Sequence, residues 1–118
     1  MSEFDRCLAS AQRSLAMREH STLQIKNKLI NKGFDSKIIE NVISEIQERG
    51  FQSDRRYAEE YIRYRQNSGY SSKKIIYELK SNGISAELIN SHMEKFKDDY
   101  NILYDFAQSK VNHVDLNE

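Results

Sequence analysis

Three lysines and one tyrosine near the middle of the sequence have the spacing to bind a charged partner. Lys73, Tyr77 and Lys80 fall at i, i+4 and i+7, so they share one face of a helix, and Lys74 lies beside them. Lysines with an aromatic ring between them suit a phosphate backbone or an acidic protein groove. The alternative interpretation is an ordinary solvated helix face.

The segment before these lysines is rich in arginine, but Glu59 and Glu60 interrupt its positive charge. A face of mixed sign suits a charged protein interface better than a nucleic-acid site. Arg65 falls on the same side as Ala58 and Tyr61, which favours a structural role with its guanidinium paired to a carboxylate such as Asp54. The candidate partner-binding residues are Arg55, Arg56, Arg63, Lys73, Lys74, Tyr77 and Lys80.

Charge is distributed unevenly along a chain that is neutral as a whole, with 18 basic and 18 acidic residues. Residues 51–83 hold seven basic and four acidic residues, whereas residues 84–118 hold three basic and seven acidic ones. A basic middle can steer binding to an acidic or DNA-lined groove. The neutral total argues against strong DNA binding by the chain alone, since that affinity depends on neutralising phosphates.

Constellations that would carry catalysis or hold a metal are missing from the sequence. It has no glycine-rich phosphate loop, no pair of histidines at zinc-binding spacing, and no nucleophile beside a base. His92 is predicted at the edge of the core, and His20 and His113 have no second ligand nearby. Cys7 is predicted to be a small apolar residue of the first helix. We therefore expect no enzyme, no cofactor and no metal.

The single cysteine and the lack of long apolar runs bear on where the protein works. One cysteine cannot form an internal disulfide and suits a reducing cytosol. No run approaches the roughly 20 apolar residues of a membrane helix, and the first residues lack a signal peptide's pattern. The sequence predicts a cytoplasmic protein without membrane contact, and we expect a monomer.

Helices are the only regular structure that the sequence predicts. Proline is absent, and Gly33, Gly50 and Gly83 each follow a helical end, the position where glycine permits a left-handed turn. Predicted N-caps are Ser21, Asp35, Ser53, Ser71 and Ser85. Apolar residues between these marks recur at helical spacing in seven segments, with Tyr57, Tyr61 and Tyr64 predicted as one core stripe. The class is all-α.

An internal repeat organises these helices. A shift of 50 residues places Ser21 on Ser71, Gly33 on Gly83 and Ile25 on Ile75. Each repeat is predicted to be three helices, and such units bury their apolar faces against neighbours in an elongated stack. The predicted division is residues 1–50, residues 51–97, and residues 98–118 as the first helix of an incomplete third repeat plus a polar tail. The same shift places Lys73, Tyr77 and Lys80 on Leu23, Asn27 and Ile30, so a semi-apolar strip becomes basic.

The two repeats carry a resemblance to a known family. The runs Gly50-Phe-Gln-Ser-Asp-Arg-Arg-Tyr-Ala-Glu-Glu-Tyr-Ile-Arg-Tyr-Arg65 and Gly69-Tyr-Ser-Ser-Lys-Lys-Ile-Ile-Tyr-Glu-Leu-Lys-Ser-Asn-Gly-Ile84 are similar to motifs of the RecX family of bacterial regulatory proteins. Residues 16–34 fit the family's first unit. Tyr70 departs from the family, which usually has proline there, and most of a third three-helix unit is missing. The chain is either a shortened member or a cut one.

The resemblance implies a regulator rather than an enzyme. RecX-like proteins bind the RecA recombinase filament on single-stranded DNA and inhibit its strand exchange, ATP hydrolysis and co-protease activity. They thereby restrain recombination and the SOS response. The predicted partner is thus the RecA filament, together with weak direct contact to DNA. Two alternatives stay open: a small helical nucleic-acid-binding protein whose basic second unit acts without RecA, and a helical adaptor for another partner.

Overall fold

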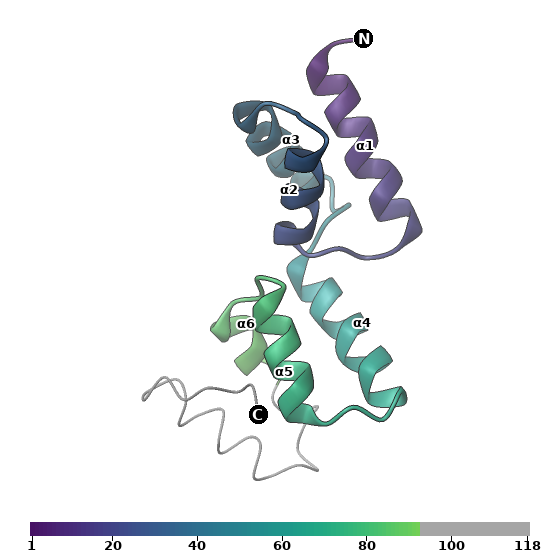
Figure 1. The fold of residues 1–118 in the computed structure, drawn as a ribbon, viewed down its shortest axis with the longest axis vertical. Coiled ribbons are helices and arrows are strands. Elements are labelled where there is room, and N and C mark those ends of the chain that lie inside the picture. Colours follow the sequence, from purple (N-terminus) through teal and green to yellow (C-terminus); the bar gives the residue numbers. More distant parts are fainter. Residues whose placement is uncertain (93–118) are drawn as a thin grey trace. The chain divides into compact units, whose positions relative to one another are not determined.

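The computed structural model describes residues 1–92, and every regular element in that range is a helix. The helices, coloured along the chain in Figure 1, are α1 (Glu3–Met17), α2 (Thr22–Asn31), α3 (Ser36–Glu48), α4 (Asp54–Asn67), α5 (Ser72–Ser81) and α6 (Ala86–Asn90). The all-α prediction is confirmed. The predicted seventh helix and third repeat lie outside the described residues.

The chain forms two compact units, Met1–Tyr57 and a second that begins at Ala58. Helices α1, α2 and α3 belong to the first unit, together with the first turn of α4. The rest of α4 belongs to the second unit with α5 and α6. Each unit has a core of its own.

The core of the first unit is an apolar cluster to which its three helices all contribute. Its members are at most 1% exposed: Cys7, Ala11, Ile25, Leu29, Ile39, Val42 and Ile46. Partly buried apolar residues, among them Phe34 at the end of α2, pack against this cluster. Burying such side chains contributes about 1.5–3 kcal/mol for each large aliphatic residue and holds the three helices together.

The core of the second unit departs from the prediction at α4. Ala58 and Ile62, at 0% and 1% exposed, are buried, as are Ile75, Ile76 and Leu79 of α5. The prediction that Tyr64 belongs to a core stripe is wrong, because Tyr64 is 62% exposed. Tyr64 follows Ile62 by two residues, which turns it about 200° around the helix, away from the buried side.

Helix termini match the local signals of the sequence. Ser21 forms a capping box with Gln24, and Asp35, Ser71 and Ser85 each accept a backbone N–H of the first turn that follows. After α2, Gly33 has a φ of +88° and ends the helix in a left-handed turn. These caps fix where α5 begins and so which of its residues face the core.

Candidate partner-binding surface

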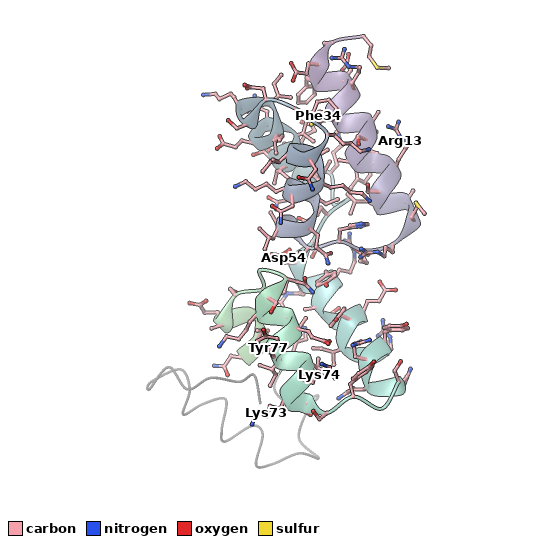
Figure 2. The ribbon with its side chains drawn as sticks, in the orientation of Figure 1. Arg13, Phe34, Asp54, Lys73, Lys74 and Tyr77 are labelled. Carbon is pink, nitrogen blue, oxygen red and sulfur yellow. The ribbon has the colours of Figure 1, made fainter. Side chains whose placement is uncertain are left out.

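Helix α5 has a buried, mainly apolar face and an opposite face that carries basic residues. Ser71 sets its phase by accepting the N–H of Lys74 at 3.2 Å, and the buried residues that follow face the core. The remaining surface carries Lys73, Lys74, Tyr77 and Lys80, which we call the lysine face. Figure 2 shows Lys73, Lys74 and Tyr77 projecting from this helix. The structure thus brings four of the seven predicted residues together on one short helix.

Exposure differs among the residues of the lysine face. Tyr77 is 38% exposed, Lys74 and Lys80 are exposed, and Lys73 is half-buried. A half-buried lysine packs its aliphatic stem along the protein and keeps its ammonium at the surface. The face can therefore present positive charge together with one aromatic ring.

Glu78 links α5 to α4 beside the lysine face. Arg65 donates two hydrogen bonds to the Glu78 carboxylate, with Nε 3.1 Å from Oε1 and a terminal nitrogen 3.0 Å from Oε2. The Tyr61 hydroxyl donates to the same Oε1 at 2.8 Å, and Lys74 Nζ lies 3.8 Å from Oε2. Burial opposes the charge of Glu78, but the hydrogen bonds from Arg65 and Tyr61 outweigh it and hold the pKa of the carboxyl below its usual range.

The aromatic rings around Arg65 complete this cluster. The guanidinium carbon stands 3.6 Å from the centre of the Tyr70 ring and 5.7 Å from that of Tyr61. A cation over an aromatic face is attracted by the ring's quadrupole. The hydrogen bond between Arg65 and Glu78 raises the pKa of Arg65 above its ordinary value, so the guanidinium stays charged. The cluster joins the α4–α5 turn to both helices.

The structural role predicted for Arg65 agrees with this arrangement, but the predicted carboxylate partner is wrong. Arg65 pairs with Glu78 and not with Asp54. Asp54 precedes Arg65 by eleven residues on the same helix, which separates them by about 16 Å along the axis. A side chain on the neighbouring helix is closer than one three turns away.

The remaining predicted arginines divide between the two units. Arg63, on α4, is exposed in the second unit, and Arg55 is exposed in the first. Arg56 also lies in the first unit, where its Nε donates to Glu19 at 2.7 Å and its terminal nitrogen to the Phe51 carbonyl at 3.1 Å. Arg56 therefore holds the segment before α4 in place, which leaves it less available to a partner than Arg55 or Arg63.

A polar network that the sequence did not reveal anchors the start of α4 within the first unit. The Gln52 side chain is buried and donates to the His20 carbonyl and to Asp54 Oδ1, each at 3.1 Å. Asp54 Oδ1 also accepts the Thr22 backbone N–H at 2.8 Å. The sequence analysis did not predict the roles of Gln52 and Glu78, because their partners, such as the His20 carbonyl and Arg65, are distant in the sequence. The one signal in the sequence that could have pointed to Glu78 is that it is the sole acidic residue of α5.

His20, His92 and Cys7 are the histidines and the cysteine among the described residues 1–92. No cluster of three metal-ligating side chains occurs in that range. His92 is buried as expected, with Nδ1 2.9 Å from the Leu88 carbonyl. His20 is also buried, and burial lowers its pKa. Burial, with the nearby charge of Glu3, raises the pKa of the Cys7 thiol, as suits a small core residue.

Over the part of the chain that the structure describes, each helix is too short or too polar to traverse a bilayer.

Comparisons with known proteins match the tandem arrangement of helices. The model for the first three-helix domain of RecX matches residues 7–45, and the model for its second three-helix domain matches residues 53–93. These two matches take up more than half of the chain and follow the order that they have in the family.

Individual relatives agree with the domain matches. The regulatory protein RecX of Legionella pneumophila (strain Corby) is 43% identical over 91 residues, which are 77% of this chain and 61% of the relative. The regulatory protein RecX of Haemophilus ducreyi is 32% identical over 103 residues, 87% of this chain and 68% of the relative. The chain thus spans about three fifths of the length of the Legionella relative. The two domain matches, in order and with relatives of this similarity, place the chain in the RecX family.

Proposed function

We propose that this chain binds the filament of the RecA recombinase on single-stranded DNA and inhibits its recombinase, ATPase and co-protease activities. In this way it would modulate recombination and the SOS response in the cytoplasm, as a monomer without catalytic activity of its own. The observation that carries the proposal is the tandem match to both RecX domains. The relatives from Legionella pneumophila and Haemophilus ducreyi are both named regulatory protein RecX.

The lysine face supports the proposal as a contact surface. A filament that holds single-stranded DNA offers both acidic side chains and phosphates to a protein in its groove. Lys73 and Lys80 can supply charge there, Tyr77 can supply an aromatic contact, and the cluster around Glu78 holds α5 on α4 so that the face keeps its shape. Arg55 and Arg63 are proposed as further contacts.

Direct nucleic-acid binding without RecA is the second candidate, favoured by the net charge of +3 over residues 51–83. The lysine face has a single aromatic residue, Tyr77, whereas single-stranded nucleic acid is usually held by several stacking rings. The neutral total charge also limits the affinity of the chain alone for DNA. RecA binding is therefore the better-supported function.

Co-sedimentation with RecA filaments, with bare single-stranded DNA in parallel, tests the two candidates. The proposal expects the chain to pellet with RecA filaments and to lower their rate of ATP hydrolysis, and to bind bare DNA much more weakly. Equal binding to bare DNA, with unchanged ATP hydrolysis, would support the second candidate instead. A chain that binds neither would refute both.

Charge changes on the lysine face test the surface itself. The variant K73E/K74Q/K80E removes its positive charge, and Lys74 becomes glutamine so that no new carboxylate faces Glu78. Loss of three charge contacts, two of them from exposed lysines, at a few tenths to about 1 kcal/mol each, should raise the concentration for half-inhibition roughly tenfold. The residual inhibition should also depend less on salt.

The matched control is K26E/K28E/K37Q in the first unit, which makes the same change of charge at exposed positions. Lys32 is left intact because its Nζ donates to Ser10 at 2.7 Å. If both variants inhibit as well as the parent chain, the lysine face is ordinary solvated surface.

A further inference from the structure

An open hollow lies where the second half of α1 meets the segment that follows α3. It has a volume of about 280 Å³, and it is lined by Gln12, Leu15, Ala16 and Phe51. Leu15 packs against the core cluster of the first unit, whereas Ala16 and Phe51 are exposed, Phe51 at 42%. All of these residues belong to the first unit, and we call this feature the α1 hollow.

The walls of the α1 hollow are held in place by hydrogen bonds that do not involve its lining side chains. The Phe51 N–H donates to the Ile46 carbonyl at 2.8 Å, which fixes Phe51 at the end of α3. The Phe51 carbonyl accepts a terminal nitrogen of Arg56 at 3.1 Å, and Arg56 Nε donates at 2.7 Å to Glu19, just beyond α1. The exposed ring of Phe51 is therefore carried on a fixed backbone, so a ligand would not have to order this wall on binding.

Arginines accompany the apolar lining along α1. Residues 6–18, which cover most of α1 and its C-cap, include Arg6, Arg13 and Arg18 and no acidic residue. Arg13 precedes Ala16 by three residues, so the two are neighbours on the helix surface. Figure 2 shows Arg13 on the side of α1 away from α3. Within the part of the chain that the structure describes, none of these arginines pairs with a carboxylate; Arg6 and Arg18 donate to backbone carbonyls.

Acidic residues at the ends of α1 and α3 are mostly neutralised. Glu19 pairs with Arg56, and Glu45 pairs with Arg49 at 2.6 Å. Glu48 is exposed and has no ion pair among the described residues, so one carboxylate remains against the two unpaired arginines at this end of α1. The remaining charge is positive, and it is complementary to a negatively charged partner.

The size and lining of the α1 hollow favour a protein as that partner. Ligand pockets usually have volumes of about 300–1,000 Å³, so 280 Å³ suits a single apolar side chain better than a cofactor. Single-stranded nucleic acid is usually held by several stacking rings, and Phe51 is the only aromatic residue of the lining. The side-chain amide of Gln12 has no hydrogen-bond partner among residues 1–92, so it can bond to the backbone of a bound segment.

We propose that the α1 hollow docks an acidic segment of a partner protein. An aliphatic or aromatic side chain of that segment inserts against Leu15 and Phe51, and carboxylates beside it pair with Arg13 and Arg18. This surface goes beyond the proposed function, because it lies on the first unit and requires neither the lysine face nor RecA. The chain thus has two separate contact surfaces of different character, one an apolar hollow and the other a basic helix face.

NMR titration of the full chain with short peptides tests the site in the absence of RecA. The probe is an acidic peptide in which one leucine and one phenylalanine lie between aspartates. We expect this peptide to shift the amide signals of Gln12, Ala16 and Phe51. The same peptide with serines for its apolar residues, or with lysines for its aspartates, should bind at least roughly tenfold more weakly. Absent shifts, or shifts caused by a thymidine oligonucleotide and not by the acidic peptide, overturn the proposal.

Two substitutions change the α1 hollow in opposite ways. F51A removes a wall but keeps the backbone hydrogen bonds of that residue, whereas A16Q fills the hollow from an exposed position of α1. Each should weaken binding of the acidic peptide roughly tenfold. The matched control is Y64A, which removes a 62% exposed aromatic residue in the second unit and should leave the affinity unchanged. Equal weakening by Y64A, or unchanged binding in both F51A and A16Q, overturns the proposal.

Charge variants and sedimentation complete the test. R13Q/R18Q should weaken binding of the acidic peptide roughly fivefold and reduce its salt dependence, since two ion pairs at the surface are lost. K26Q/K28Q makes the same change of charge at exposed positions of α2 and should have a smaller effect. Equal effects of the two double variants overturn the proposal. Self-association of the free chain in sedimentation, if F51A abolishes it, would make a second copy the occupant and also overturn the proposal.

Discussion

Removal of the Glu78 carboxylate tests whether the α4–α5 cluster stabilises the second unit. In E78A, Arg65 loses two hydrogen bonds and Tyr61 loses one. Hydrogen bonds to a charged group contribute about 1.5–3 kcal/mol each where water cannot replace them. The side chains of Arg65 and Glu78 are still 19% and 18% exposed, so water recovers part of this energy. We therefore expect E78A to lower the free energy of unfolding by about 2 kcal/mol.

Urea unfolding followed by circular dichroism measures this loss, and hydrogen exchange of the α5 amides localises it to the second unit. The matched control is E45A, which removes an exposed ion pair with Arg49 within one helix, where the two side chains are 33% and 48% exposed. That pair should be worth less than about 0.5 kcal/mol. The reasoning is refuted if E78A costs no more than E45A, or if its effect on exchange appears only in α1–α3.

The pH dependence of the same site has a definite sign. The pKa of Glu78 is lowered in the folded state, so its stabilisation is present above the unfolded value of about 4.3 and is lost as pH falls through the folded value. E78Q keeps the size of the side chain but cannot ionise. The difference in unfolding free energy between the parent chain and E78Q should therefore narrow on acidification below about pH 4.

Three further predictions concern the first unit. Gly33→Val should cost about 1–2 kcal/mol, although the space beside Gly33 is open, because its φ of +88° strains a β-branched residue; thermal melting checks this, and Gly33→Asn should cost less. Burial lowers the pKa of His20, so below about pH 6.5 the unfolded chain takes up a proton that the folded chain resists; stability should fall from neutral pH toward pH 5, and His20→Gln should flatten the fall. Cys7 is buried with a raised pKa, so iodoacetamide should modify it at least roughly tenfold more slowly in the folded chain than in urea; equal rates would contradict its place in the core.

Local signals in the sequence predicted the helices well because the physics of a cap is local. Ser21 and Ser71 accept N–H groups only three residues away, so the residue types themselves carry the information. The partner of Arg65 could not be predicted in the same way, because Glu78 is thirteen residues away and the turn of the chain brings it close. Tyr64 was misplaced for a related reason: its i+3 spacing from Tyr61 fits a helical stripe, but Ala58 and Ile62 define the side that is buried.

The lysine face was predictable as a pattern, since its spacing depends only on helical periodicity. Helical periodicity could not reveal which of the predicted basic residues already pair with carboxylates of this chain. Lys74 shares Glu78 with Arg65, and Arg56 is engaged by Glu19. These ion pairs depend on which segments pack together. The sequence alone therefore could not show that Lys74 and Arg56 have carboxylate partners within the chain.

The network of Gln52, Asp54 and Arg56 has a consequence for anyone who wishes to dissect the chain into fragments. A fragment that ends at Gly50 would keep three complete helices but would lose the groups that satisfy the His20 carbonyl, the Thr22 N–H and the Glu19 carboxylate. A fragment carried on through Tyr57 keeps them all, and the Tyr57 hydroxyl lies 3.4 Å from Gln24. The shorter fragment should therefore be harder to obtain in a folded state, because the first turn of α4 completes the polar contacts of the first unit.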